Sequence, residues 1–478
     1  MNMKTIFKSI ILSLGLLFGL VACDLDVNNY QDIPTEEAYN SVQDVQNGMN
    51  GAYWALGTYR FFGKNIIAVG DMAADIAQGS SASGHYYNFG RYIINTTDTE
   101  LNEMWEYGFR TIDRCVRTIQ GAKGVLARSS ELFLTDYDIA DINLYMSQCY
   151  SLKALSTFAL ANVFCLPYQK GRNNLGLPLL TDKPLEAFTK IERSTLGETY
   201  DLILSDIASA KRLMEEALDD GAYEPTAFYM NEAAIYALES RVNLFMDNLD
   251  AAKDAAEIAI ALKGTAFDKP GDETYVSMWS SLAITEEDIF TICKTEDDNL
   301  SANALNTLYG SYRGTLVPTI RSLFGENDIR LGLITSAHRP LKFNGLPTSQ
   351  ATNNIPIFRK SEMYLTIAEV EARLGNIAEA QEALLYTAKR DLDIATVSDL
   401  PNTQDELIEF IAEENIREFF QEGHRFYNAR RTGEIITVAA GTKPNFDVSS
   451  FVYPIPANEI NAGFCTQQND GWADNLPR

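Results

Sequence analysis

The sequence predicts a mainly α-helical protein, in which antiparallel helix pairs form a scaffold and two long irregular segments interrupt it. Apolar residues recur three and four positions apart through most of the chain, which is the spacing of one helix face. Two stretches, 226–262 and 358–390, each break this pattern at a short turn and then resume it. The pattern is lost at about 70–98 and 263–357, where glycine and serine lie among aromatic residues.

The beginning of the chain has the layout of an export signal. Lys4 and Lys8 precede an apolar run at 10–21, which is too short to span a bilayer comfortably. Ala22 before Cys23 is typical of a lipobox, after which cleavage would leave Cys23 to carry lipid. We therefore expect a signal peptide over 1–22 and a lipid anchor on Cys23.

The rest of the chain, 23–478, is expected to form one domain, because no Pro-rich or Gly/Ser-rich linker divides it. No second apolar run is long enough to span a bilayer. The net charge of −26 argues against a nucleic-acid partner, because phosphate binding needs clustered Lys and Arg. The remaining cysteines lack C-x-x-C spacing, so buried free thiols are the default: Cys115, Cys149, Cys165, Cys293 and Cys465.

The first helical elements follow in order along the chain. A helix is expected over 34–56, and two more at 105–119 and 138–164 should pair as a hairpin. Thr195 and Glu198 stand three residues apart and form a capping box at the start of the next helix. This hairpin and the helix that follows it would form the N-terminal half of the scaffold.

The stretch 358–390 is the best-specified pair. Tyr364, Ala368, Ala380 and Leu384 occupy the bulky and small positions of a unit that resembles a tetratricopeptide repeat. The stretch 226–262 aligns with it at one constant offset, which matches Tyr236, Ser240 and Ala252 to the first three of these residues. A single unit cannot bury its own apolar face, so several interrupted pairs are expected to stack.

The second irregular segment, 263–357, is too long to be a structureless loop, and 287–292 predicts a short strand within it. One more helix is expected at 405–421. The tail at 451–456 contains two prolines and is not expected to be helical.

Several motifs in this order resemble the SusD/RagB family of outer-membrane lipoproteins. They are RKSEMYL at 359–365, EGHRFY at 422–427, RRTG at 430–433 and YPIP at 453–456. Acidic Asp24 and Asp26 after Cys23 also resemble the surface-export signal of some Gram-negative lipoproteins. The resemblance extends over the whole chain after the signal peptide.

The resemblance implies a SusD-like fold, a lipid-anchored position at the cell surface on the outer membrane, and no cofactor. It also implies that the protein captures an oligosaccharide and hands it to a SusC-like, TonB-dependent barrel transporter, which it covers as a lid. The chain departs from the family pattern at three positions. Asn415 and Ile416 replace a usual arginine pair, and Asn428 replaces a usual aspartate. These positions are expected to belong to a buried polar network that locks the last helix onto the scaffold.

The irregular segments, about 70–98 and 263–357, are expected to form the ligand-facing side. Sugar binding needs flat aromatic faces together with side chains that make directed hydrogen bonds to hydroxyl groups. The predicted ligand-binding residues are Asp71, Asp75, Tyr86, Tyr87, Arg91, Trp279, Tyr309, Tyr312 and Arg313, with Phe89 and Asn306 as further members of the two sets.

Three alternatives remain open from the residues. The tyrosine content also suits capture of peptides, as in RagB-like proteins. Nearby carboxylates could support a surface glycosidase, although no nucleophile elbow or phosphate loop occurs and no catalytic residue is assigned. A helical-repeat scaffold that binds only proteins is the third. No metal site is expected, because His85, His338 and His424 are dispersed.

Overall fold

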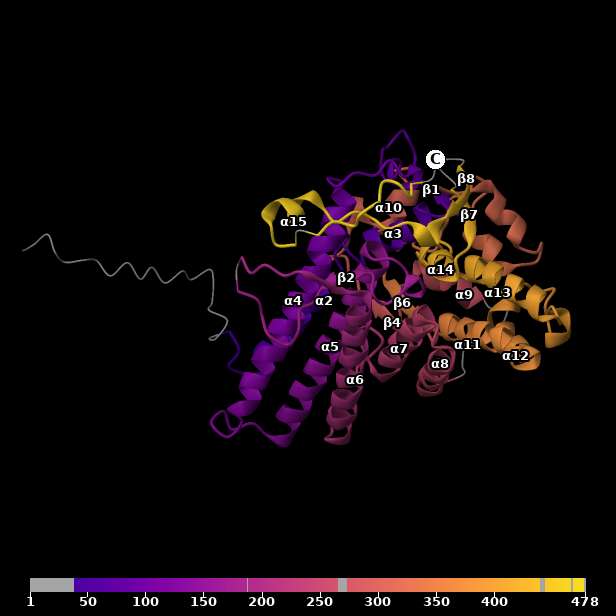
Figure 1. The fold of residues 1–478 in the computed structure, drawn as a ribbon. Helices are drawn as coiled ribbons and strands as arrows, with labels where there is room; N and C mark the ends of the chain where they lie inside the picture. Colours follow the sequence, from indigo (N-terminus) through magenta and orange to yellow (C-terminus); the bar gives the residue numbers. More distant parts are fainter. Residues whose placement is uncertain (1–37, 187, 265–272, 439–442, 466, 477–478) are drawn as a thin grey trace, which may run out of the picture.

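The computed structural model describes residues 38–186, 188–264, 273–438, 443–465 and 467–476. Helices dominate it, and the long helices follow one another side by side across the molecule (Figure 1). The helices are α2 (Val42–Leu56), α3 (Asn65–Met72), α4 (Thr99–Ala127), α5 (Asp136–Phe164), α6 (Leu196–Asp219), α7 (Glu232–Met246), α8 (Leu249–Lys263), α9 (Glu273–Ser277), α10 (Leu305–Tyr309), α11 (Lys360–Leu374), α12 (Ile377–Ala388), α13 (Gln404–Phe419), α14 (Arg425–Thr432) and α15 (Ala457–Ala462). The predicted mainly α fold is confirmed.

The strands are short and pair antiparallel, two by two. The pairs are β1 (Ala77–Gln78) with β5 (Thr315–Leu316), β2 (Leu175–Pro178) with β3 (Arg193–Thr195), β4 (Asp288–Ile292) with β6 (Ile355–Arg359), and β7 (Ile435–Val438) with β8 (Lys443–Asp447). The pair β1–β5 joins the two irregular segments to each other, and β4–β6 connects the two ends of the second segment.

The predicted helix pairs are confirmed. Helices α4 and α5 pack against each other, and α6 begins at the predicted capping box, where Thr195 and Glu198 bond reciprocally. Helix α7 pairs with α8, and the hydroxyl of Ser240 donates to the carbonyl of Ala252 at 2.8 Å, so the two small positions touch. Helix α11 ends at Gly375, whose φ of 83° lies in the left-handed region that glycine tolerates.

Two predicted helix starts were wrong for the same reason. Helix α7 begins at Glu232, because the side chain of Asn231 accepts a hydrogen bond from the backbone N–H of Ala234 and caps the helix there. Helix α2 begins at Val42, where Ser41 is the cap, and residues 38–41 are not helical. The expected start at 34 lies outside the described residues.

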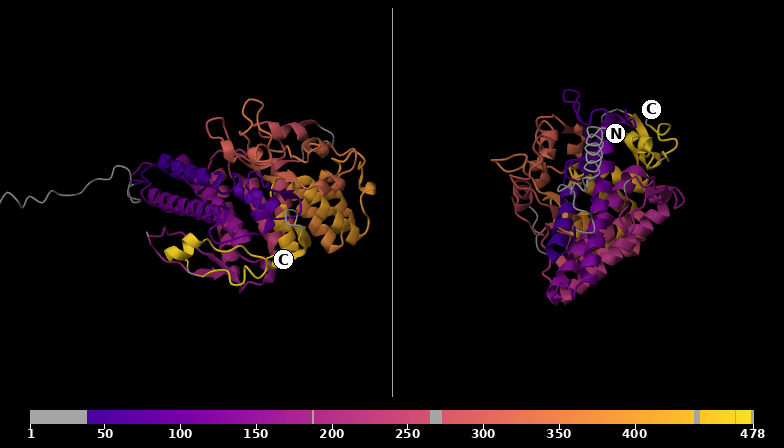
Figure 2. Two further views of the ribbon diagram at one scale, coloured as in Figure 1. Left: turned by 90° about the horizontal axis from the view of Figure 1, so that it is seen from above. Right: turned by 90° about the vertical axis from the view of Figure 1, so that its left-hand side faces the viewer.

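The second irregular segment holds α9, β4, α10, β5 and β6, which confirms that it is not structureless. The strand expected at 287–292 is β4, and its partner β6 leads directly into α11. Seen from above, this segment lies along one side of the helices (Figure 2). The tail at 451–456 is extended, as predicted.

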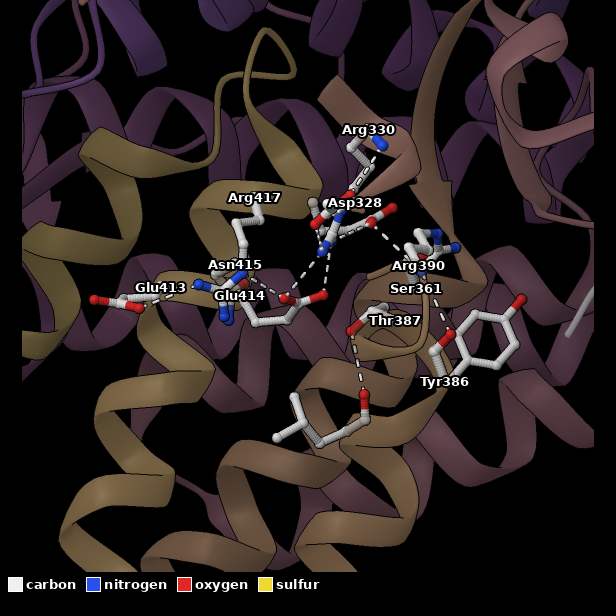
Figure 3. A network of polar contacts seen from close by, with 12 residues as sticks. Asp328, Arg330, Ser361, Tyr386, Thr387, Arg390, Glu413, Glu414, Asn415 and Arg417 are labelled. Carbon is white, nitrogen blue, oxygen red and sulfur yellow. Dashed lines mark hydrogen bonds and ion pairs between the residues drawn. The ribbon is translucent and has the colours of Figure 1, made fainter. Parts of the chain in front are cut away.

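A network of buried charged side chains fixes this segment to the scaffold. Its members, here called the ionic network, are Arg330, Lys342, Arg359, Arg390 and Arg417 with Glu287, Asp328, Glu414, Glu418 and Glu422. Arg330 bonds Asp328 at 2.8 Å and Glu414 at 2.7 Å, which links the segment to α13 (Figure 3). Burial alone would raise the pKa of Glu414, but Arg330 and Arg417 hold it below its usual range.

None of the three positions that depart from the family pattern belongs to the ionic network, and only Asn428 makes the predicted kind of contact, because it bonds Arg431 of α14, which pairs with Glu369 of α11. Asn415 bonds only the carbonyl of Ile411, at 3.1 Å, although its neighbour Glu414 belongs to the network (Figure 3). Asn428 accepts a hydrogen bond from Arg431 at 2.9 Å, and Ile416 is partly exposed. The direction in which a helical side chain points depends on its neighbours in space, and here all three residues line a cavity instead.

Candidate functional site

The two irregular segments meet at one surface. Strand β1 pairs with β5, with Ala77 opposite Leu316, and the hydroxyl of Ser83 donates to the carbonyl of Tyr312 at 2.7 Å. In Figure 1, β1 and α10 lie together at the top of the molecule. We call the surface formed by residues 83–91 and 309–316 the segment junction.

Aromatic and cationic side chains are paired across and within this junction. The ring of His85 stacks on that of Tyr312, with centroids 3.9 Å apart and planes 19° apart. The guanidinium of Arg91 lies 4.5 Å from the ring centroid of Tyr87. These four side chains are partly exposed and Arg313 is exposed, so the junction presents aromatic and guanidinium groups to solvent.

Burial and then the charge of Lys64 lower the pKa of His85. Its imidazole is therefore mostly neutral at neutral pH, and it can both donate and accept a hydrogen bond. A neutral ring stacked on a phenol forms a flat face with polar edges. Such a face suits a ligand that has both apolar and hydroxyl-bearing sides.

The backbone at the junction is held in an uncommon conformation. Tyr86 and Arg313 have φ values of 55° and 59°, in the left-handed region that bulky residues seldom adopt. The hydroxyl of Tyr86 donates to the side-chain oxygen of Asn65 at 2.6 Å, which holds its ring inward. Strain of this kind persists only where the surroundings impose it, and such positions cluster at functional sites.

Four predicted ligand residues lie in the interior. Asp71, Tyr86, Trp279 and Tyr309 are each at most 5% exposed, and the further candidates Phe89 and Asn306 are also buried. Burial raises the pKa of Asp71 well above its usual range, and its carboxylate accepts a hydrogen bond from the backbone N–H of Gly423. The prediction that these residues lie at the surface was wrong. Aromatic side chains of a loop can also pack the loop against the core, and the aromatic residues in this set do so.

Asp75, which is partly exposed, and buried Trp279 both contact other parts of the chain. Asp75 forms an ion pair with Arg425 at 2.7 Å, which ties the first segment to α14. The ring of Trp279 lies beneath the ammonium of Lys342, 4.9 Å from the centroid, next to the ionic network. The candidates that reach the surface are Asp75, Tyr87, Arg91, Tyr312 and Arg313, and Tyr312 meets the first segment through His85.

His85 was missed as a candidate by the sequence reasoning. Its position directly before Tyr86 and Tyr87, in a segment of glycine and serine, was the available signal. Its stacking partner is far away in the sequence, so no local pattern indicates the pair.

Within the described part of the chain, no group of three or more His, Cys, Asp or Glu side chains is arranged to hold a metal ion. The helices of that part include none that is long and apolar enough to cross a membrane. Its five cysteines are unpaired, and only Cys293 among them is exposed. Cys23, the expected lipid carrier, lies outside the described residues.

The fold is that of a mainly helical protein in which two irregular segments meet at one surface. Residues 25–244 match the family described as "Starch-binding associating with outer membrane", and residues 338–472 match the family described as "SusD family". The chain belongs to the SusD/RagB family.

Relatives and solved structures agree with this assignment. SusD-like protein P38 of Formosa agariphila is 24% identical over 90% of this chain and 91% of its own. Starch-binding protein SusD of Bacteroides thetaiotaomicron is 34% identical over 27% of this chain and 24% of its own. The crystal structure of a SusD superfamily protein from Bacteroides vulgatus has a TM-score of 0.78 and 25% identity, and covers 91% of this chain and 100% of its own.

Proposed function

We propose that this protein is a cell-surface glycan-binding protein that captures an oligosaccharide at the segment junction. The observation that carries the proposal is the stack of His85 on Tyr312 beside the Tyr87 and Arg91 pair. The family description and the name of the SusD relative, both of which refer to starch binding, support a glycan as the ligand class.

The chemistry of the junction fits this ligand. Apolar C–H faces of sugar rings would pack on the aromatic rings, which contribute about 0.5–1.5 kcal/mol per favourable ring contact. The guanidinium groups of Arg91 and Arg313 would donate hydrogen bonds to sugar hydroxyls, which are good acceptors. Binding of this kind orients a sugar without breaking a bond, and we assign the protein no enzymatic activity and no cofactor.

The remaining part of the proposal concerns the cell. We place the protein on the outer surface of the outer membrane, held by lipid on Cys23, because of the lipobox and the family description. There it would pass the captured oligosaccharide to a SusC-like, TonB-dependent barrel transporter. Labelling with radioactive palmitate, which is expected in the wild type and lost in Cys23→Ala, tests the anchor.

Titration calorimetry against neutral oligosaccharides, including starch fragments, and against short peptides tests the ligand class. We expect oligosaccharide binding that Tyr312→Ala weakens at least tenfold. Tyr223→Ala is a matched control, because Tyr223 is 91% exposed and lies outside the junction. Binding of peptides alone would support the RagB-like alternative. Hydrolysis of a bound glycan that one Asp or Glu substitution abolishes would support the glycosidase.

A further inference from the structure

A cavity of about 750 Å³ lies between α7, α11, α13 and α14. Its lining includes no residue of the segment junction. Exposed residues Asp405, Ile408, Glu409 and Thr432 surround its mouth. Ligand cavities in proteins commonly measure roughly 300–1,000 Å³, so this one has the size of a small-molecule site.

A smaller chamber of about 80 Å³ lies behind the cavity. Phe62, Ile66, Phe158 and Phe245 form its apolar wall. The two spaces share one wall, because six residues line both: Leu244, Glu369, Asn415, His424, Asn428 and Arg431. The chamber has room for more than one water-sized group, since a single water needs only about 10–15 Å³ on this measure.

Polar groups without a protein partner lie in this shared wall and in the adjoining wall of the chamber. The ring nitrogens of His424, the amide nitrogen of Asn428, the amide oxygen of Asn415 and the hydroxyl of Thr366 form no hydrogen bond to another side chain or backbone group among the described residues. These groups come from α11, α13, α14 and the residue before α14. Polar groups in such a position need a ligand or water to satisfy them.

The charges of the lining leave little place for an anion. Arg431 pairs with Glu369 at 2.5 Å, and Arg241 pairs with Glu362 at 2.5 Å. Asp405 and Glu409 at the mouth form no ion pair among the residues that the structure describes. Lys170, Arg373 and Arg425 in the lining also pair with carboxylates, whereas buried Arg430 has no carboxylate partner among the described residues and donates to three backbone carbonyls. The exposed cations of the lining are thus paired, while the carboxylates of Asp405 and Glu409 would repel a negatively charged ligand.

We propose that this cavity is a second saccharide site, which binds one or two units of a neutral sugar. Hydroxyl groups donate and accept at once, as do a neutral imidazole and a primary amide, so they match His424, Asn415 and Asn428. The apolar faces of the sugar would lie against Leu244, Ile411 and Ile416, which line the cavity itself. A peptide side chain fits less well, because it offers either an apolar surface or a single polar group. The proposal does not depend on glycan binding at the segment junction.

The histidines provide the test, since the chain has only three. His424 lies in the cavity wall and His85 lies at the junction, so their ring signals in NMR spectra report the two places separately. The probes are glucose, galactose, maltose and lactose, with glucuronate as the anionic and trialanine as the peptide comparison. We expect at least one neutral sugar to shift the His424 signal saturably, and glucuronate to shift it far less.

Two substitutions separate binding from folding. Asn415→Leu and Asn428→Leu should each weaken the His424 response at least tenfold, and Asn415→Leu leaves the bond between Asn428 and Arg431 intact. Asn402→Leu is the matched control, because Asn402 is exposed and lies outside the cavity lining. Thermal unfolding of each variant shows that it is folded. Tyr312→Ala should abolish only the response of His85.

The outcomes are distinct. No His424 response of the folded wild-type protein to any of the four sugars, or a response only to trialanine or glucuronate, would overturn the second site. A His424 response that both leucine variants retain would also overturn it. If sugars shift the His424 signal of the wild-type protein but not its His85 signal, the proposed junction site is wrong and the second site is supported.

Discussion

The second irregular segment is held by opposite means at its base and at its tip. Its base is fixed by the ionic network, in which Arg359 bonds Glu287, Glu418 and Glu422 with almost no exposure to solvent. Its tip meets the first segment through the exposed stack of His85 on Tyr312. The base is therefore held by ion pairs shielded from solvent, and the tip by ring contacts that are partly exposed to solvent.

One segment can thus be fixed at its base and still be exposed to solvent at its tip. Buried, mutually paired charges cannot be changed singly without leaving a partner uncompensated. Exposed ring contacts each contribute little to folding, so the tip can vary with the ligand while the base stays fixed. Substitutions at each end of the segment test this difference.

The largest effect is expected from Arg359→Met. Its removal takes one ion pair of 2.7–2.8 Å from each of three buried carboxylates, which keep only their contacts with other cations, such as Lys342 with Glu422 and Arg390 with Glu418. We therefore expect a loss at the low end of about 3–5 kcal/mol in the free energy of unfolding. Urea unfolding measures this change. Arg212→Met is the matched control, because its pair with Glu216 is exposed and contributes about 0–1 kcal/mol. Equal losses in the two variants would contradict the special role of the base.

A pH dependence should distinguish the buried scaffold from the tip. Burial and then Arg241 and Arg359 hold the pKa of His424 well below its usual value, so the folded protein keeps it neutral while the unfolded chain binds a proton below about pH 6.5. Stability is thus full above that pH and falls by about 1.4 kcal/mol per pH unit below it, until the folded pKa is reached. Urea unfolding at pH 7.5 and 5.5 should show a smaller loss in His424→Gln than in wild type. His338→Gln should behave as wild type does, and an identical loss in all three proteins would be evidence against the prediction.

At the tip, Arg91→Ala should affect binding more than folding. The contact of Arg91 with Tyr87 is partly exposed and contributes about 0.5–1 kcal/mol, and its donors would also be lost to the sugar. We expect a several-fold weaker oligosaccharide affinity in calorimetry and a loss of at most about 1 kcal/mol in the free energy of unfolding, measured in urea. A stability loss as large as that of Arg359→Met would remove the distinction between base and tip.

The smallest effect is expected from Ser83→Ala, which removes the hydrogen bond to the carbonyl of Tyr312. A single bond of this kind contributes about 0.5–1.5 kcal/mol, and partial exposure places this one at the low end. Hydrogen exchange at residues 310–314 should become faster, with little change elsewhere. Ser81→Ala, at an exposed position in the same segment, is the control. Unchanged exchange would show that the strand pair alone holds the junction.

The features that depend on neighbours a few residues away could be predicted from the sequence alone. The capping box of Thr195 and Glu198, the turn at Gly375 and the strand β4 follow from short-range preferences, and the ordered motifs indicated the family. The first residue of α7 was not predictable in this way, because one hydrogen bond to the side chain of Asn231 decides where the helix begins.

Which of the candidate side chains are exposed depends on the tertiary structure. Tyr86 and Tyr87 are adjacent and chemically alike, yet a φ of 55° at Tyr86 turns it into the core while Tyr87 stays at the surface. His85 gains its role from Tyr312 in a distant segment, and Asn415 lines a cavity while Glu414 next to it joins the ionic network. Helix formation depends on local backbone energetics, whereas exposure and partnership depend on segments that meet only when the chain folds.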